Sequence, residues 1–331
     1  MTAKSLKIKQ RPKSLIADPA NAALGVLCIF SLFLIFKNPD IAVKHMTHAL
    51  TLCAKTVIPS LFPFMALSEL LVLGNTVSVI SPLLRRPARL LFGIGGEGAA
   101  AVALGLFCGF PIGAKSAVSL YRQGRIGKWE LTRILTFSNS PSSAFLISAV
   151  GASMFDSREF GALLFAISTL SALIIGFVGK FTKKKSPDSR SEPLVDICDK
   201  KSGVEIFTSA ITSSALSMLY VCAFVVFFST LVGVLEYTVN AASLPDGVAA
   251  LWFGFFELTS GVWKTAEIPV YGPYLAAVIV GWSGLSVHFQ IMSICSGCGV
   301  SFKPYILAKL ATAGINLLLL LTYSAIFGLP M

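Results

Sequence analysis

Long apolar stretches separated by short polar or basic segments dominate the pattern of this chain. The stretches run through residues 20–36, 58–80, 90–121, 129–155, 160–181, 207–235, 269–295 and 305–327. A helix needs about 20 apolar residues to cross the hydrocarbon core of a bilayer, and most of these stretches reach that length. Since a helix satisfies its own backbone hydrogen bonds in lipid, the pattern predicts an all-α polytopic membrane protein.

The composition supports a membrane protein and changes how the charge is interpreted. Hydrophobic residues make up 55% of the 331 residues and charged residues only 13%, whereas a soluble domain carries about 25% charged residues. The net charge of +11 comes largely from basic clusters between the apolar stretches, which is typical of cytoplasmic loops. We therefore expect the basic N-terminus in the cytoplasm and no nucleic-acid partner.

Two apolar stretches in the first half contain helix-breaking residues. Residues 90–121 have basic residues on both flanks, so the stretch must enter the membrane and turn back, and glycine and proline at 109–113 mark the turn. This predicts a re-entrant hairpin, because each arm is too short to cross. Residues 129–155 are interrupted by the sequence SNSPSS at 138–143, which predicts a discontinuous transmembrane helix.

The second half repeats this layout in the opposite direction through the membrane. Residues 247–266 form a short apolar hairpin that turns near Glu257, and residues 269–295 are broken by glycine and serine at 281–284. A span, a hairpin, a broken span and a span thus occur twice. This order predicts two inverted repeats, each with a re-entrant hairpin and a discontinuous transmembrane helix, an arrangement in which substrates bind at the breaks near the middle of the membrane.

The same pattern divides the chain into four parts. They are a basic tail with an anchor helix and an interfacial amphipathic helix at residues 1–57, a first Gate-like repeat at 58–181, a cytoplasmic linker at 182–204 and a second inverted repeat at 205–331. We expect the amphipathic helix, residues 41–57, to lie on the membrane surface. Within the first repeat we expect residues 58–80 to cross the membrane and residues 85–89 to form a basic loop.

The helix breaks supply the candidate binding site. Irregular backbone at membrane depth is tolerated only where it is buried in protein or faces a watery cavity. A half-helix that begins at such a break points its positive end at the cavity, which suits a carboxylate. The candidate substrate-binding residues are Gly109, Pro111, Gly113, Lys115, Asn139, Ser140, Ser142, Glu257, Ser283, His288 and Gln290.

Several of these residues also have a purely structural interpretation. Lys115 could extend to the cytoplasmic interface instead of facing the cavity. The small residues could serve only to bring helices close together. His288 could be a proton-linked switch or a core histidine. Glu257 is harder to explain structurally, because an ionisable side chain in a membrane segment is costly and points to a functional role.

The sequence favours neither an enzyme nor a metal protein. It contains no arrangement of a nucleophile with a base and no phosphate-binding glycine motif. Among seven cysteines only Cys295 and Cys298 have a suggestive spacing, and no second ligand pair accompanies them. We therefore predict no cofactor and no metal, although a transporter could use Na⁺ or H⁺ as a coupling ion.

Three motifs in the first half resemble a known family. They are GFPIGAK at 109–115, YRQG at 121–124 and FSNSPSSAF at 137–145. With these motifs the chain resembles sporulation integral membrane proteins of the YlbJ type, which belong to a wider group that carries the nucleoside-recognition or Gate domain. The second half matches in layout only, at FFELT (255–259) and at 281–290. The resemblance implies a transporter-like protein in a forespore membrane, with dipicolinate as the leading substrate.

Two other functions remain open at this stage. The wider group implies ion-coupled nucleoside transport, and a scaffold that moves no substrate is also compatible with buried helix breaks. Lys115 in the cavity would favour an anion over a nucleoside. The expected partners are a small-molecule anion and the lipid bilayer, and further copies of the chain or other sporulation membrane proteins could join them.

Overall fold

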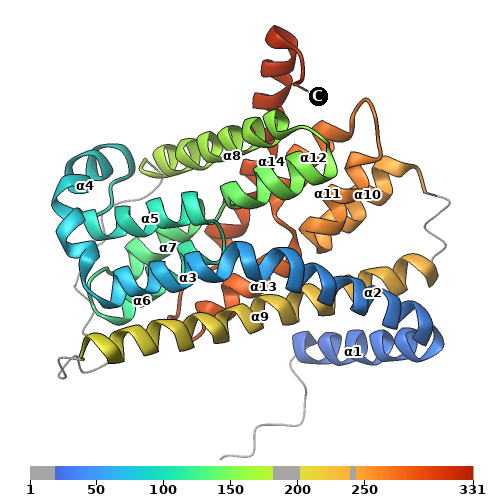
Figure 1. The fold of residues 1–331 in the computed structure, drawn as a ribbon, viewed down its shortest axis with the longest axis horizontal. Helices are drawn as coiled ribbons and strands as arrows, with labels where there is room; N and C mark the ends of the chain where they lie inside the picture. The colour runs from blue at the N-terminus through green and yellow to red at the C-terminus, as the bar shows by residue number, and fades with distance from the viewer. Residues whose placement is uncertain (1–18, 182–201, 239–243, 331) are drawn as a thin grey trace, which may run out of the picture.

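The protein is a bundle of helices, several of which are long enough to cross a membrane (Figure 1). The computed structural model describes residues 19–181, 202–238 and 244–330, and every regular element in these ranges is a helix. Among them, four segments have spanning length and apolarity: α8 (Arg158–Gly179), α9 (Gly203–Thr238), α12 with α13 (Gly272–Ile294) and α14 (Lys303–Phe327). Two bent helix pairs raise the number to six. The prediction of an all-α polytopic membrane protein is confirmed.

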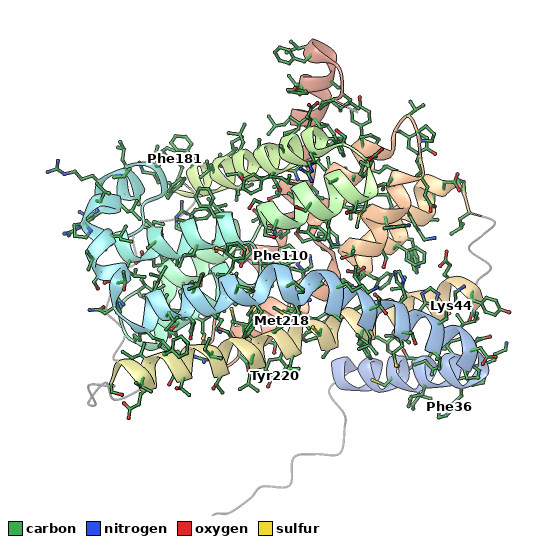
Figure 2. All side chains as sticks on the ribbon, in the orientation of Figure 1. Phe36, Lys44, Phe110, Phe181, Met218 and Tyr220 are labelled. Atoms are coloured by element: carbon green, nitrogen blue, oxygen red, sulfur yellow. The ribbon has the colours of Figure 1, made fainter. Side chains whose placement is uncertain are left out.

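The exterior of the bundle is apolar, as expected for a surface in contact with lipid. Figure 2 shows Phe36, Phe181 and Tyr220 on the outside of the ribbon, and these side chains are 80%, 70% and 57% exposed. Met218 precedes Tyr220 by two residues on α9 and is buried. Residues that are two positions apart in a helix lie on nearly opposite faces, so α9 presents one face to the protein and the other to the outside.

The N-terminal part forms a bent pair of helices followed by one long helix. α1 (Pro19–Lys37) and α2 (Pro39–Leu52) meet at a bend of 102°. α2 continues through the π-helical segment η1 (Cys53–Val57) into α3 (Ile58–Leu73), because the residues at both junctions keep right-handed helical dihedrals. α2 and α3 pack against α9 (Figure 1). Residues 41–57, which we predict to lie on the membrane surface, are continuous with α3 and pack against α9, and their position relative to the membrane stays a prediction.

The segment after α3 corrects one boundary of the prediction. The chain bends by 86° after Leu73 and continues as α4 (Thr76–Phe92). The helix predicted at residues 58–80 therefore ends at Leu73, and the predicted basic loop at 85–89 is helical. Asn75 has a left-handed backbone conformation with φ of 61°, which ends α3. The residues after it form an amphipathic helix because apolar and basic positions alternate with a helical period.

The hairpin and the broken helix of the first half form at the predicted residues. α5 (Gly96–Cys108) and α6 (Ile112–Arg122) are a helical hairpin that turns at residues 109–111. α7 (Lys128–Phe137) ends at the polar break, and the chain resumes a helical course in the π-helical segment η2 (Phe145–Met154) before α8.

The second half has the same order of elements after α9. α10 (Asp246–Phe256) and α11 (Leu258–Ala266) are a second helical hairpin with Glu257 at the turn. α12 (Gly272–Trp282) and α13 (Gly284–Ile294) are separated at Ser283, and α14 follows. A hairpin, a broken helix and a long helix therefore occur twice. The inverted relation of the two halves and the re-entrant path of the hairpins stay predictions.

Loops that we predict on the same side of the membrane lie together. Arg122 Nη2 donates a hydrogen bond to the Ser296 carbonyl at 3.3 Å and so links the loops that follow α6 and α13. At the other end, Ser157 Oγ donates to the Pro330 carbonyl at 2.6 Å, which links the start of α8 to the C-terminal residues. Two inverted repeats, as predicted, would place the two segments of each contact on the same side of the membrane.

Candidate functional site

The tip of the first hairpin packs directly against the break that follows α7. The Phe110 N–H donates to the Ser140 carbonyl at 2.9 Å. Gly109 has φ of 83°, and a Cβ on it would lie 2.5 Å from the Ser142 nitrogen. A Cβ on Gly105 or Gly113 would overlap the Ser138 carbonyl oxygen. The glycines are needed because two irregular backbone segments meet here without space for side chains.

The second hairpin and the second broken helix meet in a similar way. Glu257 caps the N-terminus of α11, and its two carboxylate oxygens accept hydrogen bonds from the Thr259 and Ser260 N–H groups at 3.0 and 2.7 Å. Gly284 has φ of 81°, and a Cβ on it would lie 2.9 Å from the Leu258 nitrogen. The turn at Glu257 and the break at Ser283 are therefore in contact.

Lys309 connects the break of the first half to the break of the second half. It lies on α14, and its ammonium donates hydrogen bonds to the Asn139 carbonyl and, at 3.2 Å, to Ser283 Oγ. The residue is only 4% exposed. In the part of the chain that the structure describes, no carboxylate forms an ion pair with it. A buried ammonium with neutral partners therefore stands where both sets of broken helices meet.

Lys309 belongs to a polar stripe on an otherwise apolar helix. Tyr305, Lys309, Thr312 and Asn316 follow one another at spacings of three or four residues, and all four are buried. Such a spacing places them on one face of α14. The Tyr305 hydroxyl contacts His288 Nδ1 at 2.9 Å. Sequence reasoning missed this stripe, although a lysine and an asparagine inside a long apolar stretch were the available signal.

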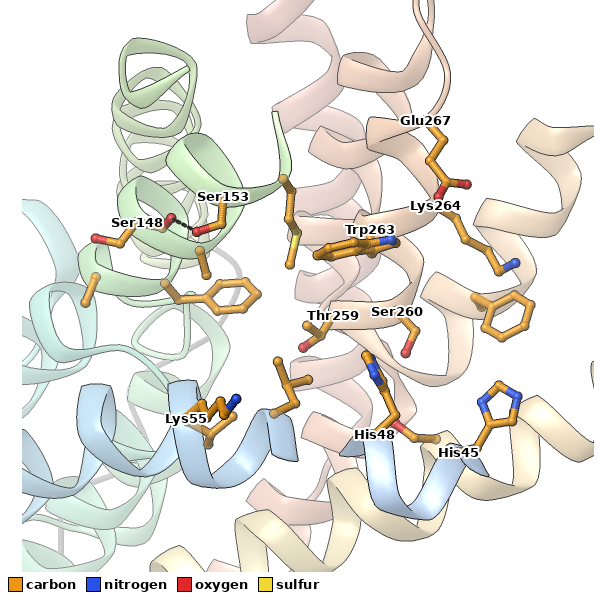
Figure 3. Close-up of a pocket in the computed structure, with 18 of the residues that line it drawn as sticks. His45, His48, Lys55, Ser148, Ser153, Thr259, Ser260, Trp263, Lys264 and Glu267 are labelled. Carbon is orange, nitrogen blue, oxygen red and sulfur yellow. Dashed lines mark hydrogen bonds between the residues drawn. The ribbon is translucent and has the colours of Figure 1, made fainter. Parts of the chain in front are cut away.

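A large open cavity leads toward the breaks from one side of the bundle. This cavity, called the vestibule here, has a volume of about 690 Å³. Figure 3 shows its walls: His45, His48 and Lys55 come from the α2–η1 helix, Ser148 and Ser153 from η2, and Trp263 and Lys264 from α11. Its lining includes the basic side chains of Lys55 and Lys264 and the acidic side chains of Glu236 and Glu267.

A small inner pocket of about 50 Å³ lies next to the vestibule and shares Val57, Phe145 and Thr259 with it. Its other walls include predicted site residues from both halves, namely Ser142, Glu257 and Gln290. The Gln290 Nε2 donates to Ser286 Oγ at 3.3 Å, and its Oε1 has no hydrogen-bond partner among the described residues. The inner pocket therefore joins residues of the first break, of the second hairpin turn and of α13 next to the vestibule.

The predicted site residues fall into three groups. Ser142, Glu257 and Gln290 line the inner pocket. Asn139, Ser283 and His288 lie around Lys309 and Tyr305, and Gly109, Pro111, Gly113 and Ser140 form the packed contact between the hairpin tip and the first break. Asn139 Oδ1 and His288 Nε2 are buried without a hydrogen-bond partner among the described residues.

Lys115 lies apart from the inner pocket. Its ammonium donates to Ser214 Oγ at 3.0 Å and is 3.9 Å from Glu69 Oε2, and its side chain is 9% exposed. It therefore neither lines the inner pocket nor extends to the membrane interface. The role of Lys115 in substrate binding stays a prediction, and its pairing with a carboxylate on α3 could not be read from sequence spacing.

A comparison with curated proteins identifies a relative over most of the chain. The sporulation integral membrane protein YlbJ of Bacillus subtilis (strain 168) is 27% identical over 325 residues, which cover 87% of this chain and 80% of that protein. The resemblance to the YlbJ type is confirmed. The similarity to YlbJ extends well beyond the three motifs of the first half. No protein-family model matches the chain, and no solved structure matches it.

Proposed function

We propose that the protein carries a small organic anion across a forespore membrane, with dipicolinate as the leading substrate. The observation that carries the proposal is Lys309, a buried ammonium whose partners are a backbone carbonyl and a hydroxyl. A charge buried at membrane depth without a counter-charge is costly. A bound carboxylate would supply the counter-charge, whereas a neutral nucleoside would not.

Helix ends near Lys309 add to this preference for an anion. α6 begins directly after the hairpin tip, and α13 begins at Gly284, beside Ser283. The N-terminus of a helix favours negative charge because its first N–H groups lack partners within the helix. Glu257 occupies the N-terminus of α11 with its own carboxylate, so this end is already neutralised.

The two cavities suggest how a substrate approaches. The vestibule is large enough for a small aromatic dicarboxylate, but the inner pocket of about 50 Å³ has space for little more than a few water molecules. In this conformation the vestibule therefore borders on an inner pocket that is too small for such a substrate. Val57, Phe145 and Thr259 line both cavities. Entry of a substrate into the inner pocket needs a displacement of the elements that carry these residues, as expected for a carrier that exposes its site alternately.

Uptake into reconstituted vesicles tests the proposal. The purified protein should move labelled dipicolinate into vesicles faster than protein-free vesicles do, and uridine at the same concentration should remain outside. Uptake of uridine without dipicolinate would replace the anion carrier by the nucleoside transporter. If neither compound moves while the protein is folded and inserted, a scaffold that moves no substrate becomes the better explanation.

A further inference from the structure

A second buried polar cluster lies between the first hairpin and the long helices behind it. It consists of Glu69 on α3, Lys115 on α6, and Ser213 and Ser214 on α9, and we call it the Glu69 cluster. Glu69 is 6% exposed and Lys115 is 8% exposed. Neither residue lines the vestibule or the inner pocket.

The pairing inside the Glu69 cluster is incomplete. The distance of 3.9 Å between Lys115 Nζ and Glu69 Oε2 is too long for a hydrogen bond. Glu69 Oε1 accepts one long hydrogen bond from Ser213 at 3.4 Å, and Oε2 accepts none from the described residues. By contrast, Glu97 receives hydrogen bonds from Arg125 at 2.7 and 3.0 Å.

A buried carboxylate with so few hydrogen bonds can lose its charge by binding a proton. A carboxylate removed from water needs either several hydrogen bonds or a close counter-charge, and binding a proton removes the need. The charged groups that act on Glu69 are Lys115 and, from farther away, Arg122, both on α6. No second acid among the described residues contributes, so a proton added to Glu69 would leave Lys115 with Ser214 as its hydrogen-bond partner.

The position of Lys115 links such a proton to the candidate site. Lys115 lies within the first turn of α6, whose start follows the hairpin tip at Gly109 and Pro111. Its attraction to Glu69 holds α6 against α3, and its bond to Ser214 holds α6 against α9. Neutralising Glu69 removes the first of these attractions and leaves the second, so protonation weakens the contact between the hairpin and α3.

We propose that Glu69 is a proton-binding site through which the movement of the α5–α6 hairpin is coupled to a proton. The transport part of this inference rests on the proposed function, whereas the binding of the proton does not. In the coupled cycle, the carboxylate of Glu69 takes up one proton as the hairpin leaves α3 and returns it when the contact re-forms. An anion that crosses together with this proton is driven by a pH gradient.

Two measurements on the full-length protein in vesicles test the inference. Wild-type vesicles with an imposed pH gradient should accumulate dipicolinate above equilibrium, and Glu69→Gln should abolish this accumulation while it retains exchange of labelled for unlabelled dipicolinate. Glu69→Asp should restore part of the accumulation, and Glu97→Gln, which removes a carboxylate outside the cluster, should behave like the wild type. Gradient-driven accumulation by Glu69→Gln would overturn the inference.

Infrared difference spectra after a pH step separate this inference from the proposed function. The wild type and Glu97→Gln should show the band of a buried protonated carboxyl that Glu69→Gln lacks, whether or not dipicolinate is transported. If the band is missing from the wild type, Glu69 binds no proton and the inference fails. If Glu69→Gln does not insert, Glu69→Gln with Lys115→Met removes both charges together and serves in its place, with the same two outcomes.

Discussion

At the scale of single residues, the candidate site depends on Lys309, which the sequence pattern did not single out. Lys309 stands near the start of the last apolar stretch, where the positive-inside rule already accounts for a basic residue. Only the packing of α14 against both breaks shows that its ammonium contacts Asn139 and Ser283. Glu257 was found from sequence because an acid at a predicted turn inside a membrane segment has no such simple explanation.

Replacing Lys309 by methionine should weaken anion binding without preventing insertion. A charge-assisted hydrogen bond contributes about 1.5–3 kcal/mol, so the half-saturation concentration for dipicolinate should rise roughly 10- to 100-fold. Among the described residues Lys309 has no carboxylate partner, so its replacement leaves no buried counter-charge unpaired. Dipicolinate uptake by reconstituted Lys309→Met and wild-type protein gives the two half-saturation concentrations to compare.

Lys303→Met is the matched control, because Lys303 is exposed on the same helix. It should bind dipicolinate as the wild type does. An unchanged half-saturation concentration in Lys309→Met would show that the ammonium does not meet the substrate.

At the scale of elements, the breaks were predictable and the long helices were less so. Glycine, proline and serine inside apolar stretches located both hairpin turns and both broken helices. The continuity of residues 39–73 was missed because basic and histidine side chains on α2 suggested a surface helix, whereas the structure directs two of them, His45 and His48, to the vestibule. The end of α3 was missed because the apolar pattern continues past Asn75.

A methyl group at Gly113 should separate the hairpin tip from the first break. The added Cβ would overlap the Ser138 carbonyl and lie 2.9 Å from Gly105 Cα. Overpacking of this kind costs about 1–3 kcal/mol. We expect Gly113→Ala to lower the thermal stability of the detergent-solubilised protein and to abolish dipicolinate uptake.

Gly314→Ala provides the control, since a Cβ on this glycine of α14 would meet nothing within 4 Å. Alanine is favoured over glycine in a helix by about 1 kcal/mol, so this variant should be at least as stable as the wild type. Equal stability and activity in Gly113→Ala would mean that the hairpin and the break do not need their close contact.

At the scale of the whole molecule, the sequence supplied the class and the order of the elements, and the structure supplied the contacts between the halves. Ser142, Glu257 and Gln290 line one inner pocket although they come from elements far apart in sequence. No local pattern encodes such a meeting. The sidedness of the loops, in contrast, remains a prediction from charge alone.

Labelling from one side of the membrane tests that topology. Single cysteines at Arg86 and Glu205, which are both exposed, should react only from the cytoplasmic side because the predicted basic side is cytoplasmic. Cysteines at Glu159 and Asp246, also exposed, should react only from the opposite side. The variants belong in a background without the native cysteines. Reaction of all four positions from the same side would contradict the inverted repeats.

The π-helical segment η1 inserts one surplus residue into the long helix of residues 39–73. A π turn holds one residue more than an α turn, and one residue corresponds to a rotation of about 100° around the helix axis. His45 and His48 precede this segment and line the vestibule, whereas Glu69 follows it in the Glu69 cluster. If the surplus residue moved along the helix, only the residues that it passes would rotate, and both ends of the helix would keep their contacts.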